Sequence, residues 1–367
     1  MPKRNAEVAE AASRANSSES RPPFVGQERV VEYFQRLGAN RLAHAYLFSG
    51  PRGVGKKTLA RTLARTLHCE RPSSFPLGYC GTCGPCIRGF AGSSGDTIVV
   101  TPEFIRKADA LAGKPERKTD DMSMEAARAV IREMQMHSYE GNRLVCILPD
   151  FENVTGDIVY NALLKELEEP GENKTFIITV ERAESVLPTV RSRATEIRFG
   201  PLSQGAIARQ LETHHGVEKQ RAAALARRAQ GSLGDALAEL DEDVGALRAA
   251  ARDWVLACLR TPDEMPPVPP LSKEGRDAAR ADLDEILRQA RIAVRDVAAC
   301  SLGGEKSILD PEGATQARAM AAALGARAVH IVIAAFDALN DATRLANTNV
   351  QPAQILGWLE IRLRSIR

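Results

Sequence analysis

The residues with the clearest chemical potential lie in a glycine-rich run at residues 50–58. The run almost completes the pattern G-x-x-x-x-G-K-[ST], in which glycines let backbone N–H groups surround phosphate oxygens. Gly50, Gly53 and Gly55 suit that role. Lys56 stands where a lysine neutralises the terminal phosphates of a nucleotide. The sequence therefore predicts a phosphate-binding loop with ATP as its ligand.

The last position of this pattern departs from the rule. Lys57 stands where a hydroxyl that binds Mg²⁺ belongs. Thr58 follows one residue later, and one step along a helix turns a side chain by about 100°. Whether Lys56 still binds a nucleotide is open, because backbone amides alone retain some affinity for phosphate.

A second part of such a site is an acidic residue after a buried strand. The apolar run 144–148 is typical of a strand buried on both faces of a parallel sheet, and Asp150 follows it in the position that helps to hold Mg²⁺. Phe151 then occupies the place of the catalytic base, although it has no proton-accepting group. If the segment continues extended, Glu152 faces the opposite side. Asp150 as the simple start of a loop is the alternative.

Four cysteines are bunched in the spacing C-x10-C-x2-C-x2-C, with glycine-containing turns between the last three. Cys69, Cys80, Cys83 and Cys86 suit a tetrahedral Zn²⁺ in a closed structural site, which leaves no open position for catalysis. Free thiols in a flexible loop are the alternative. His68 offers an alternative ligand, but it is better explained as a residue at a helix end.

The elements that must position these residues follow from five short strand patterns, four of them mainly apolar, which helical patterns mostly separate. They are residues 44–48, 97–100, 144–148, 176–179 and 195–199. The first run leads into the glycine loop, and a helix with leucines at four-residue spacing follows the loop. Ser123 is expected to cap a helix that reaches Met136. The fold class is therefore α/β, with a doubly wound five-stranded parallel sheet.

The composition changes after residue 200, where strand patterns give way to Ala, Leu, Arg and Glu. We expect a disordered tail at residues 1–23 and an α/β domain at 24–200, with the cysteine module inserted at about 69–86. A small helical domain at 201–243 and a larger helical bundle at 244–367 are expected to follow.

The bulk properties exclude several classes of protein. The chain has 367 residues and is nearly balanced in charge, with 49 Lys and Arg against 47 Asp and Glu. A basic surface over the whole molecule is therefore excluded. We find no uninterrupted apolar stretch of transmembrane length and no apolar block at the start that would serve as a secretory signal. We expect a cytoplasmic protein with no membrane partner.

Two longer stretches carry a family resemblance. Residues 161–170, Asn-Ala-Leu-Leu-Lys-Glu-Leu-Glu-Glu-Pro, and residues 187–193, Leu-Pro-Thr-Val-Arg-Ser-Arg, resemble the clamp-loader AAA+ subunits of bacterial DNA polymerase III. The glycine loop and the four cysteines occur in that family's order and approximate spacing. Within the family the chain is most similar to the delta-prime subunits.

The resemblance implies roles that the residues alone do not show. Ser192 and Arg193 match the family's Ser-Arg-Cys motif, with Ala194 in place of Cys. The resemblance implies that Arg193 is an arginine finger that reaches the ATP of a neighbouring subunit. The partners it implies are gamma/tau ATPase subunits, a delta subunit, the sliding clamp indirectly, and primed DNA within the complex.

The chain also departs from the ATPase members of that family. Gly234 stands where they place a sensor-two arginine, and Val180 or Glu181 stands near the sensor-one polar position. With Lys57 and Phe151, these departures favour a stator that completes a neighbour's site and hydrolyses little or no ATP itself.

Two alternatives belong to other classes. A gamma/tau-type motor subunit would hydrolyse ATP, but it requires the hydroxyl and the acidic pair that this chain lacks. A zinc-containing nucleic-acid-binding module requires basic and aromatic residues around the cysteines. Only Arg71, Phe75, Tyr79 and Arg88 are near.

Overall fold

The computed structural model describes residues 24–114, 122–136, 138, 143–154, 157–168, 171–240, 242–260, 267–273, 275–346, 348 and 350–366. The described residues up to Gly216, together with Gly231–Gly234, form one compact unit, here called the sheet unit. Val217–Gln230 and the described residues from Asp235 onward form the other, the helical unit. The expected disordered tail at residues 1–23 lies outside the described residues.

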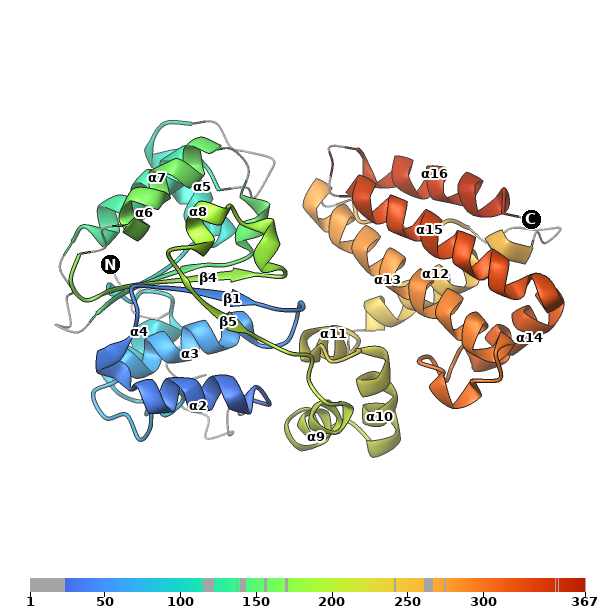
Figure 1. Ribbon diagram of the computed structural model, residues 1–367, viewed down its shortest axis with the longest axis horizontal. Coiled ribbons are helices and arrows are strands. Elements are labelled where there is room, and N and C mark those ends of the chain that lie inside the picture. The colour runs from blue at the N-terminus through green and yellow to red at the C-terminus, as the bar shows by residue number, and fades with distance from the viewer. Residues whose placement is uncertain are drawn as a thin grey trace, which may run out of the picture. The chain divides into compact units, whose positions relative to one another are not determined.

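The sheet unit is built on five parallel strands in the order β2-β3-β4-β1-β5 (Figure 1). The strands are β1 Ala45–Ser49, β2 Thr97–Val99, β3 Leu144–Leu148, β4 Lys174–Val180 and β5 Thr195–Arg198. Each agrees with one of the five predicted strand segments, so the predicted parallel sheet is confirmed. Every residue of β3 is buried, which explains its uninterrupted apolar sequence.

Helices cover both faces of this sheet (Figure 1). Successive side chains of a strand point to opposite faces, so Tyr46 and Phe48 of β1 pack with Phe34 and Leu63 on one side. Leu47 of β1 joins the core on the other side. The helices on the first side are α2 Glu28–Leu37, α3 Lys56–His68 and α4 Gly84–Phe90. Those on the second are α5 Pro102–Leu111, α6 Met124–Met134, α7 Asp157–Glu168 and α8 Pro188–Arg191.

The helix starts follow ordinary capping chemistry. Ser123 caps α6 as predicted, because its hydroxyl accepts the N–H of Ala126 at 3.0 Å. Thr101 caps α5 in the same way, with Pro102 at the first helical position. This second helix was not among the sequence predictions, because it follows β2 with almost no intervening turn.

The remaining elements are short 3-10 turns and the helices after β5. The 3-10 turns are η1 Ala39–Arg41, η2 Phe151–Asn153, η3 Ala183–Ser185, η4 Glu305–Ser307 and η5 Gly325–Arg327. The helices are α9 Gln204–His215, α10 Lys219–Arg228, α11 Leu233–Ala238, α12 Glu242–Arg260, α13 Arg276–Ser301, α14 Ala314–Leu324, α15 Ala328–Ala346 and α16 Pro352–Arg364. No strand follows β5 in the described part of the chain, as the change in composition predicts.

The helical unit combines an apolar core around Trp254 with a buried network of ion pairs. Arg228 on α10 pairs with Glu239 at 2.8 Å and with Asp310 at 3.4 Å, and Arg248 on α12 pairs with the same Glu239 at 3.2 Å. These pairs satisfy charges that would be costly to bury alone. These ion pairs also join residues on both sides of residue 243. The predicted small helical domain that ends at this residue stays a prediction.

One stretch departs from the sequence expectation about membranes. Residues Ala314–Ala346 are long and apolar enough to cross a membrane by length and composition alone. The stretch comprises α14, η5 and α15, and side chains such as Ile331 and Leu339 are buried in the core of the helical unit. Core helices of globular domains pass the same test, so the stretch is weak evidence for a membrane segment.

The segment Gly231–Gly234 packs directly against the glycine loop within the sheet unit. The N–H of Gly234 donates to the carbonyl of Gly53 at 3.1 Å. A Cβ atom at Gly53 would lie 2.0 Å from the hydroxyl of Ser232, and Gly53 has a φ of +71°. The loop therefore needs glycine at this position both for its backbone conformation and for the close approach of this segment.

Replacing Gly53 by alanine, with Gly92 as the control, separates the requirement for a positive φ from the requirement for space. Gly92 has a φ of +67°, but no atom lies within 4 Å of the position that a Cβ would take there. We expect Gly53→Ala to lower the free energy of unfolding by about 1–3 kcal/mol more than Gly92→Ala, because only the first substitution overpacks the loop. Urea titration of the full chain measures the difference, and equal losses would contradict the packing described.

Candidate functional site

The predicted phosphate loop lies between β1 and α3, at the edge where the parallel strands end. Gly50 and Gly55 have φ values of +145° and +100°, which favour glycine. The N–H of Gly50 donates to the carbonyl of Glu181, just after β4, at 3.1 Å. A Cβ at Gly50 would lie 2.3 Å from the carbonyl oxygen of Phe199. The predicted glycines thus shape a strand–loop–helix junction whose backbone is tightly packed.

The Lys56 side chain is directed into the loop. Its ammonium donates to the carbonyl oxygens of Gly50 at 2.5 Å and Pro51 at 2.7 Å, and the residue is 6% exposed. Burial lowers the pKa of Lys56, while the nearby carboxylates of Glu181 and Glu152 act in the opposite direction. A phosphate that entered the loop would have to replace the carbonyl oxygens as the partner of this ammonium.

Lys57 takes the position beside the acidic residue of the site. Its ammonium forms an ion pair with the carboxylate of Asp150. Thr58 is exposed on α3. Asp150 has left-handed backbone angles, φ 48° and ψ 48°, and its N–H donates to the hydroxyl of Thr179 at 3.1 Å. The loop and Asp150 therefore come together as predicted, but Lys57 supplies the cation.

The segment after Asp150 corrects one sequence expectation. Phe151–Asn153 form the 3-10 turn η2, so the assumption that the chain continues extended is wrong. Phe151 is 1% exposed and its ring meets that of Tyr160 edge to face, with centroids 5.1 Å apart. The place of the expected base is therefore part of the apolar core.

The same turn brings Glu152 back toward the edge of the sheet. Its Oε1 accepts the N–H of Glu181 at 3.0 Å, and burial raises the pKa of Glu152. Thr179 is a second residue that the sequence predictions missed. It is fully buried at the penultimate position of β4, one residue before Val180 and Glu181, the two positions that the sequence analysis considered for the sensor-one residue. A polar residue that ends an apolar run was the available signal.

Arg193 lies just after α8 and is held by contacts within its own chain. Its Nη1 donates to the carbonyl of Thr189 at 2.7 Å and to the hydroxyl of Ser192 at 3.2 Å. Its Nη2 forms an ion pair with Oε1 of Glu168, the last residue of α7, at 2.5 Å. These partners lie on α7 and around α8, so the structure does not bring Arg193 to the chain's own phosphate loop.

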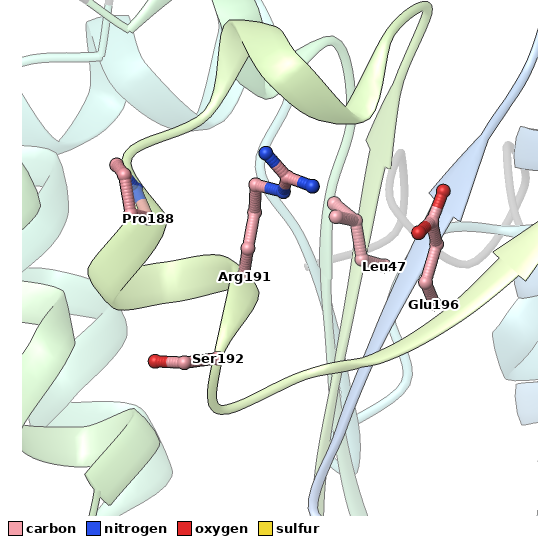
Figure 2. Close-up of a pocket in the computed structure, with 5 residues that line it drawn as sticks. All are labelled: Leu47, Pro188, Arg191, Ser192 and Glu196. Atoms are coloured by element: carbon pink, nitrogen blue, oxygen red, sulfur yellow. The ribbon is translucent and has the colours of Figure 1, made fainter.

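A cavity of about 320 Å³ adjoins the Arg193 segment. The side chains of Leu47, Pro188, Arg191, Ser192 and Glu196 line it (Figure 2). Glu196 accepts the hydroxyl of Ser49 at 2.8 Å and pairs with Arg198 at 3.0 Å, and Arg198 lowers the pKa of Glu196. Ser192 therefore belongs both to the wall of an open, charged cavity and to the contacts that hold Arg193.

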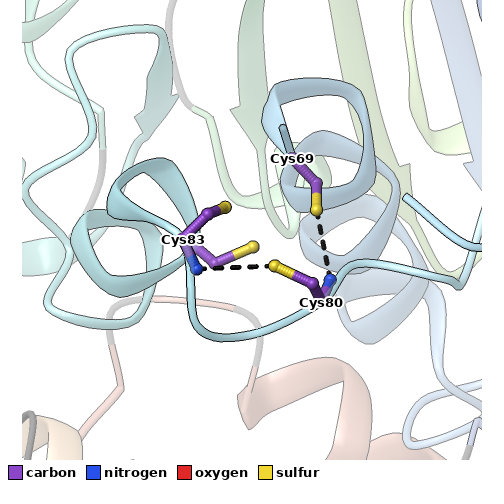
Figure 3. A group of neighbouring side chains, drawn as sticks. Cys69, Cys80 and Cys83 are labelled. Atoms are coloured by element: carbon purple, nitrogen blue, oxygen red, sulfur yellow. Dashed lines mark hydrogen bonds between the residues drawn. The ribbon is translucent and has the colours of Figure 1, made fainter. Parts of the chain in front are cut away.

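The four cysteines come together as predicted. Figure 3 labels three of them, Cys69, Cys80 and Cys83. All four Sγ atoms lie within 4.8 Å of one another. Tetrahedral zinc with Zn–S bonds of about 2.3 Å requires Sγ atoms about 3.8 Å apart, so the cluster needs little contraction to hold the ion. Cys69 follows the end of α3 and Cys83 precedes α4, so two helix ends position the group.

The backbone around the cysteines stabilises thiolates. The N–H of Cys83 donates to Sγ of Cys80 at 3.4 Å, and the N–H of Cys80 donates to Sγ of Cys69 at 3.1 Å. Backbone N–H groups of Thr82 and Cys83 lower the pKa of Cys80 to about 5, whereas burial raises the pKa of Cys86. The donor set and its geometry fit a structural Zn²⁺.

His68 does not belong to this cluster. It is buried at the last position of α3, and the grouped ligands among the described residues are the four cysteines alone. Its assignment as a helix-end residue agrees with this placement.

The fold and the loop together define a class of protein. A parallel sheet whose first strand leads through a glycine loop into a helix is a P-loop domain of the α/β class. Here the loop carries an internal cation at the acidic residue and no hydroxyl in the position that binds Mg²⁺.

Comparison with known proteins identifies the family. Residues 26–203 match the family described as DNA polymerase III, delta subunit. The chain is 34% identical over 225 residues to DNA polymerase III subunit gamma/tau of Mycobacterium tuberculosis, across 59% of this chain and 36% of that relative. It is 35% identical over 159 residues to subunit delta′ of Pseudomonas aeruginosa, across 43% of this chain and 44% of that relative.

A solved structure gives only a weak global similarity. It is a DNA polymerase III gamma subunit-related protein from Thermotoga maritima, 13% identical, with a TM-score of 0.37 over 92% of this chain and 97% of that one. The chain spans less than half the length of the gamma/tau and delta′ relatives named above. The match over residues 26–203 and these relatives support the clamp-loader AAA+ family of DNA polymerase III for that part of the chain.

Zinc analysis of the purified chain tests the cysteine cluster. We expect about one zinc per chain, and Cys86→Ser should release the metal because three thiolates leave the tetrahedral shell open. The thermal unfolding temperature should fall with the metal. Cys300→Ser is the matched control, since Cys300 lies on α13 of the helical unit and is not one of the four grouped cysteines. Full zinc content in the Cys86 variant would contradict the assignment.

Titration with a fluorescent ATP analogue, in Mg²⁺ and in EDTA, tests whether the ammonium of Lys57 takes the place of Mg²⁺ beside Asp150. The affinity of the wild-type chain should change less than about twofold between the two conditions, because Lys57 already neutralises Asp150. In Lys57→Thr, Mg²⁺ should strengthen binding by about tenfold, because the hydroxyl returns and the carboxylate is released. Arg52→Thr alters an exposed charge of the same loop and should keep the wild-type ratio. A strong dependence on Mg²⁺ in the wild type would contradict the role given to Lys57.

Proposed function

We propose that the chain is a delta-prime-like stator subunit of the DNA polymerase III clamp loader. It hydrolyses little or no ATP itself and completes the ATPase site of a neighbouring subunit with Arg193. The observation that carries the proposal is the ion pair between Lys57 and Asp150, which puts a side-chain ammonium on the acid that would hold Mg²⁺. Because the ammonium of Lys57 competes with Mg²⁺ for Asp150 and no hydroxyl follows Lys56, we expect the chain's own loop to support phosphoryl transfer poorly.

The chemistry of Arg193 suits action on another chain. A guanidinium stabilises the negative charge that develops on a transferred phosphoryl group, and its fork can meet two oxygens at once. Ser192 and the carbonyl of Thr189 fix one edge of this guanidinium. The other edge faces Glu168, and the side chain is 33% exposed. A neighbour's nucleotide would therefore meet an arginine whose direction is already set.

The remaining parts have supporting roles in this proposal. Zn²⁺ on the four cysteines would be structural, and ATP at Lys56 would be an optional remnant. The partners would be gamma/tau ATPase subunits and a delta subunit, with the sliding clamp contacted indirectly and primed DNA inside the complex. We place the protein in the cytoplasm with these partners.

A gamma/tau-type motor subunit is the second candidate, because the relatives of that name align over 225 residues. That function requires a Mg²⁺-binding hydroxyl after Lys56 and a base after Asp150. Lys57 and the buried Phe151 occupy these places. Gly234, at the place of the sensor-two arginine, also packs on the loop without any side chain to reach a phosphate.

The zinc-containing nucleic-acid-binding module receives less support. Single-stranded nucleic acid binds to exposed aromatic faces that basic residues flank. Around the cysteines, the guanidinium of Arg65 instead lies 4.3 Å from the ring centroid of Phe90 and 6.0 Å from that of Tyr79. These side chains pack with one another and with the cluster.

Arg193→Ala tests the stator proposal in the assembled clamp loader. We expect turnover at the neighbouring site to fall by about a thousandfold, the lower end for loss of an arginine finger. The DNA-stimulated ATPase activity of the complex should fall by the part that the neighbouring site contributes. The complex should still assemble, as gel filtration can check.

Arg198→Ala is the matched control, since it removes an exposed arginine whose partner is Glu196. Unaltered turnover in the Arg193 variant would remove the finger assignment. Robust ATP hydrolysis by the isolated wild-type chain would instead support the motor subunit.

A further inference from the structure

The contacts of Arg193 divide its guanidinium into two edges with different partners. Nη1 is bound by neutral groups of its own segment, the carbonyl of Thr189 and the hydroxyl of Ser192. The hydroxyl of Ser192 also donates to that carbonyl at 3.0 Å, which ties the two acceptors together. Nη2 is bound by a charged group from another helix, Glu168 at the end of α7. Only the second contact has the character of an ion pair.

We propose that Glu168 is a positioning residue that holds Arg193 in reserve until a neighbour's nucleotide displaces its carboxylate. The inference rests on the proposed function, because it concerns the same arginine. Carboxylate and phosphate oxygens are alternative acceptors for one guanidinium fork, so both cannot occupy the same Nη2 edge. In the exchange no covalent bond is formed or broken, and Glu168 releases an ion pair that a phosphate takes over.

The exposure of the pair makes this exchange easy. Arg193 is 33% exposed and Glu168 is 45% exposed, so water and salt weaken their attraction. Glu168 is also the final residue of α7, where its side chain can turn away without disturbing a helix interior. Meanwhile the Nη1 contacts stay in place, so the arginine keeps its direction while it changes its partner.

The same helix offers a matched control for this role. Glu166 lies two residues earlier on α7, and its Oε1 accepts Nε2 of Gln135 at 3.2 Å. It therefore carries the same kind of side chain on the same helix but has a neutral partner. Any effect of charge or helix stability in general should appear equally at both glutamates, whereas an effect through Arg193 should appear only at Glu168.

The reserve state has a kinetic consequence. When only a fraction of a protein is in the state that can bind its ligand, the apparent dissociation constant is the intrinsic one divided by that fraction. If Arg193 is free about a third of the time, Glu168→Gln should lower the ATP concentration for half-maximal turnover by about threefold. The maximal rate should stay unchanged, because saturating ATP already draws Arg193 away from Glu168.

The experiment uses the reconstituted clamp loader with primed DNA and the sliding clamp. ATP hydrolysis is measured across ATP concentrations with the wild-type chain, Glu168→Gln, Glu166→Gln, Arg193→Ala and the Glu168→Gln, Arg193→Ala double variant. Support requires a lower half-saturating ATP concentration for Glu168→Gln alone, a wild-type value for Glu166→Gln, and no further effect of Glu168→Gln once Arg193 is absent.

Two outcomes separate the failure of this inference from that of the proposed function. If Arg193→Ala lowers turnover but Glu168→Gln leaves the half-saturating concentration unchanged or lowers the maximal rate, the reserve role is overturned and the finger stands. If Arg193→Ala behaves as the wild type, the proposed function fails and the inference fails with it.

A double-mutant cycle on the isolated chain adds a readout that does not depend on catalysis. Thermal unfolding of the same variants should show coupling between residues 168 and 193 that shrinks as salt is raised. No coupling at low salt would overturn the ion pair on which the inference stands.

Discussion

The ion pair between Lys57 and Asp150 is the interaction on which the proposed role of this protein depends. The parallel sheet makes it possible, because all its strands end at the same edge, so the first turn of α3 after β1 and the segment after β3 come together although β4 lies between these two strands. At this edge the carboxylate of Asp150 offers a place for a positive charge. In a magnesium-dependent site the charge is a metal ion that also contacts phosphate. Here it is a side chain that the chain itself supplies.

Other residues at this edge of the sheet also differ from those of a magnesium-dependent ATPase site. Phe151 is buried against Tyr160 where a base would be needed, and the N–H of Asp150 is bound by Thr179. Gly234 lies on Gly53 with a hydrogen bond between their backbones. Each contact stabilises the loop as a packed junction of the fold. In the proposed function, the chemistry therefore falls to Arg193, which lies on different elements and has a partly exposed side chain.

Local patterns predicted much of this fold from the sequence. The central strands β1, β3 and β4 were visible because strands buried on both faces are mainly apolar, and Ser123 was visible because an N-cap is decided by adjacent residues. The cysteine cluster was visible because its spacing allows convergence on one ion. The proximity of Asp150 to the loop also followed, since both adjoin strand ends of one sheet.

The features that were missed depend on tertiary contacts. The ion pairs of Lys57 and Arg193 join residues from separate elements, and no spacing in the sequence encodes them. The turn that brings Glu152 toward Glu181 was mistaken for extended chain, because its direction depends on how Phe151 is buried. The apolar stretch Ala314–Ala346 was overlooked because Arg318 and Arg327 interrupt it, although α15 carries a long apolar side toward its core.

An electron cryo-microscopy structure of the assembled clamp loader with a non-hydrolysable ATP analogue and Mg²⁺ tests the central claim most directly. We predict that Arg193 contacts the terminal phosphate held by a neighbouring subunit, while Lys57 remains paired with Asp150 and no Mg²⁺ lies beside it. A Mg²⁺-bound nucleotide in this chain's own loop, with Arg193 distant from any phosphate, would contradict this claim.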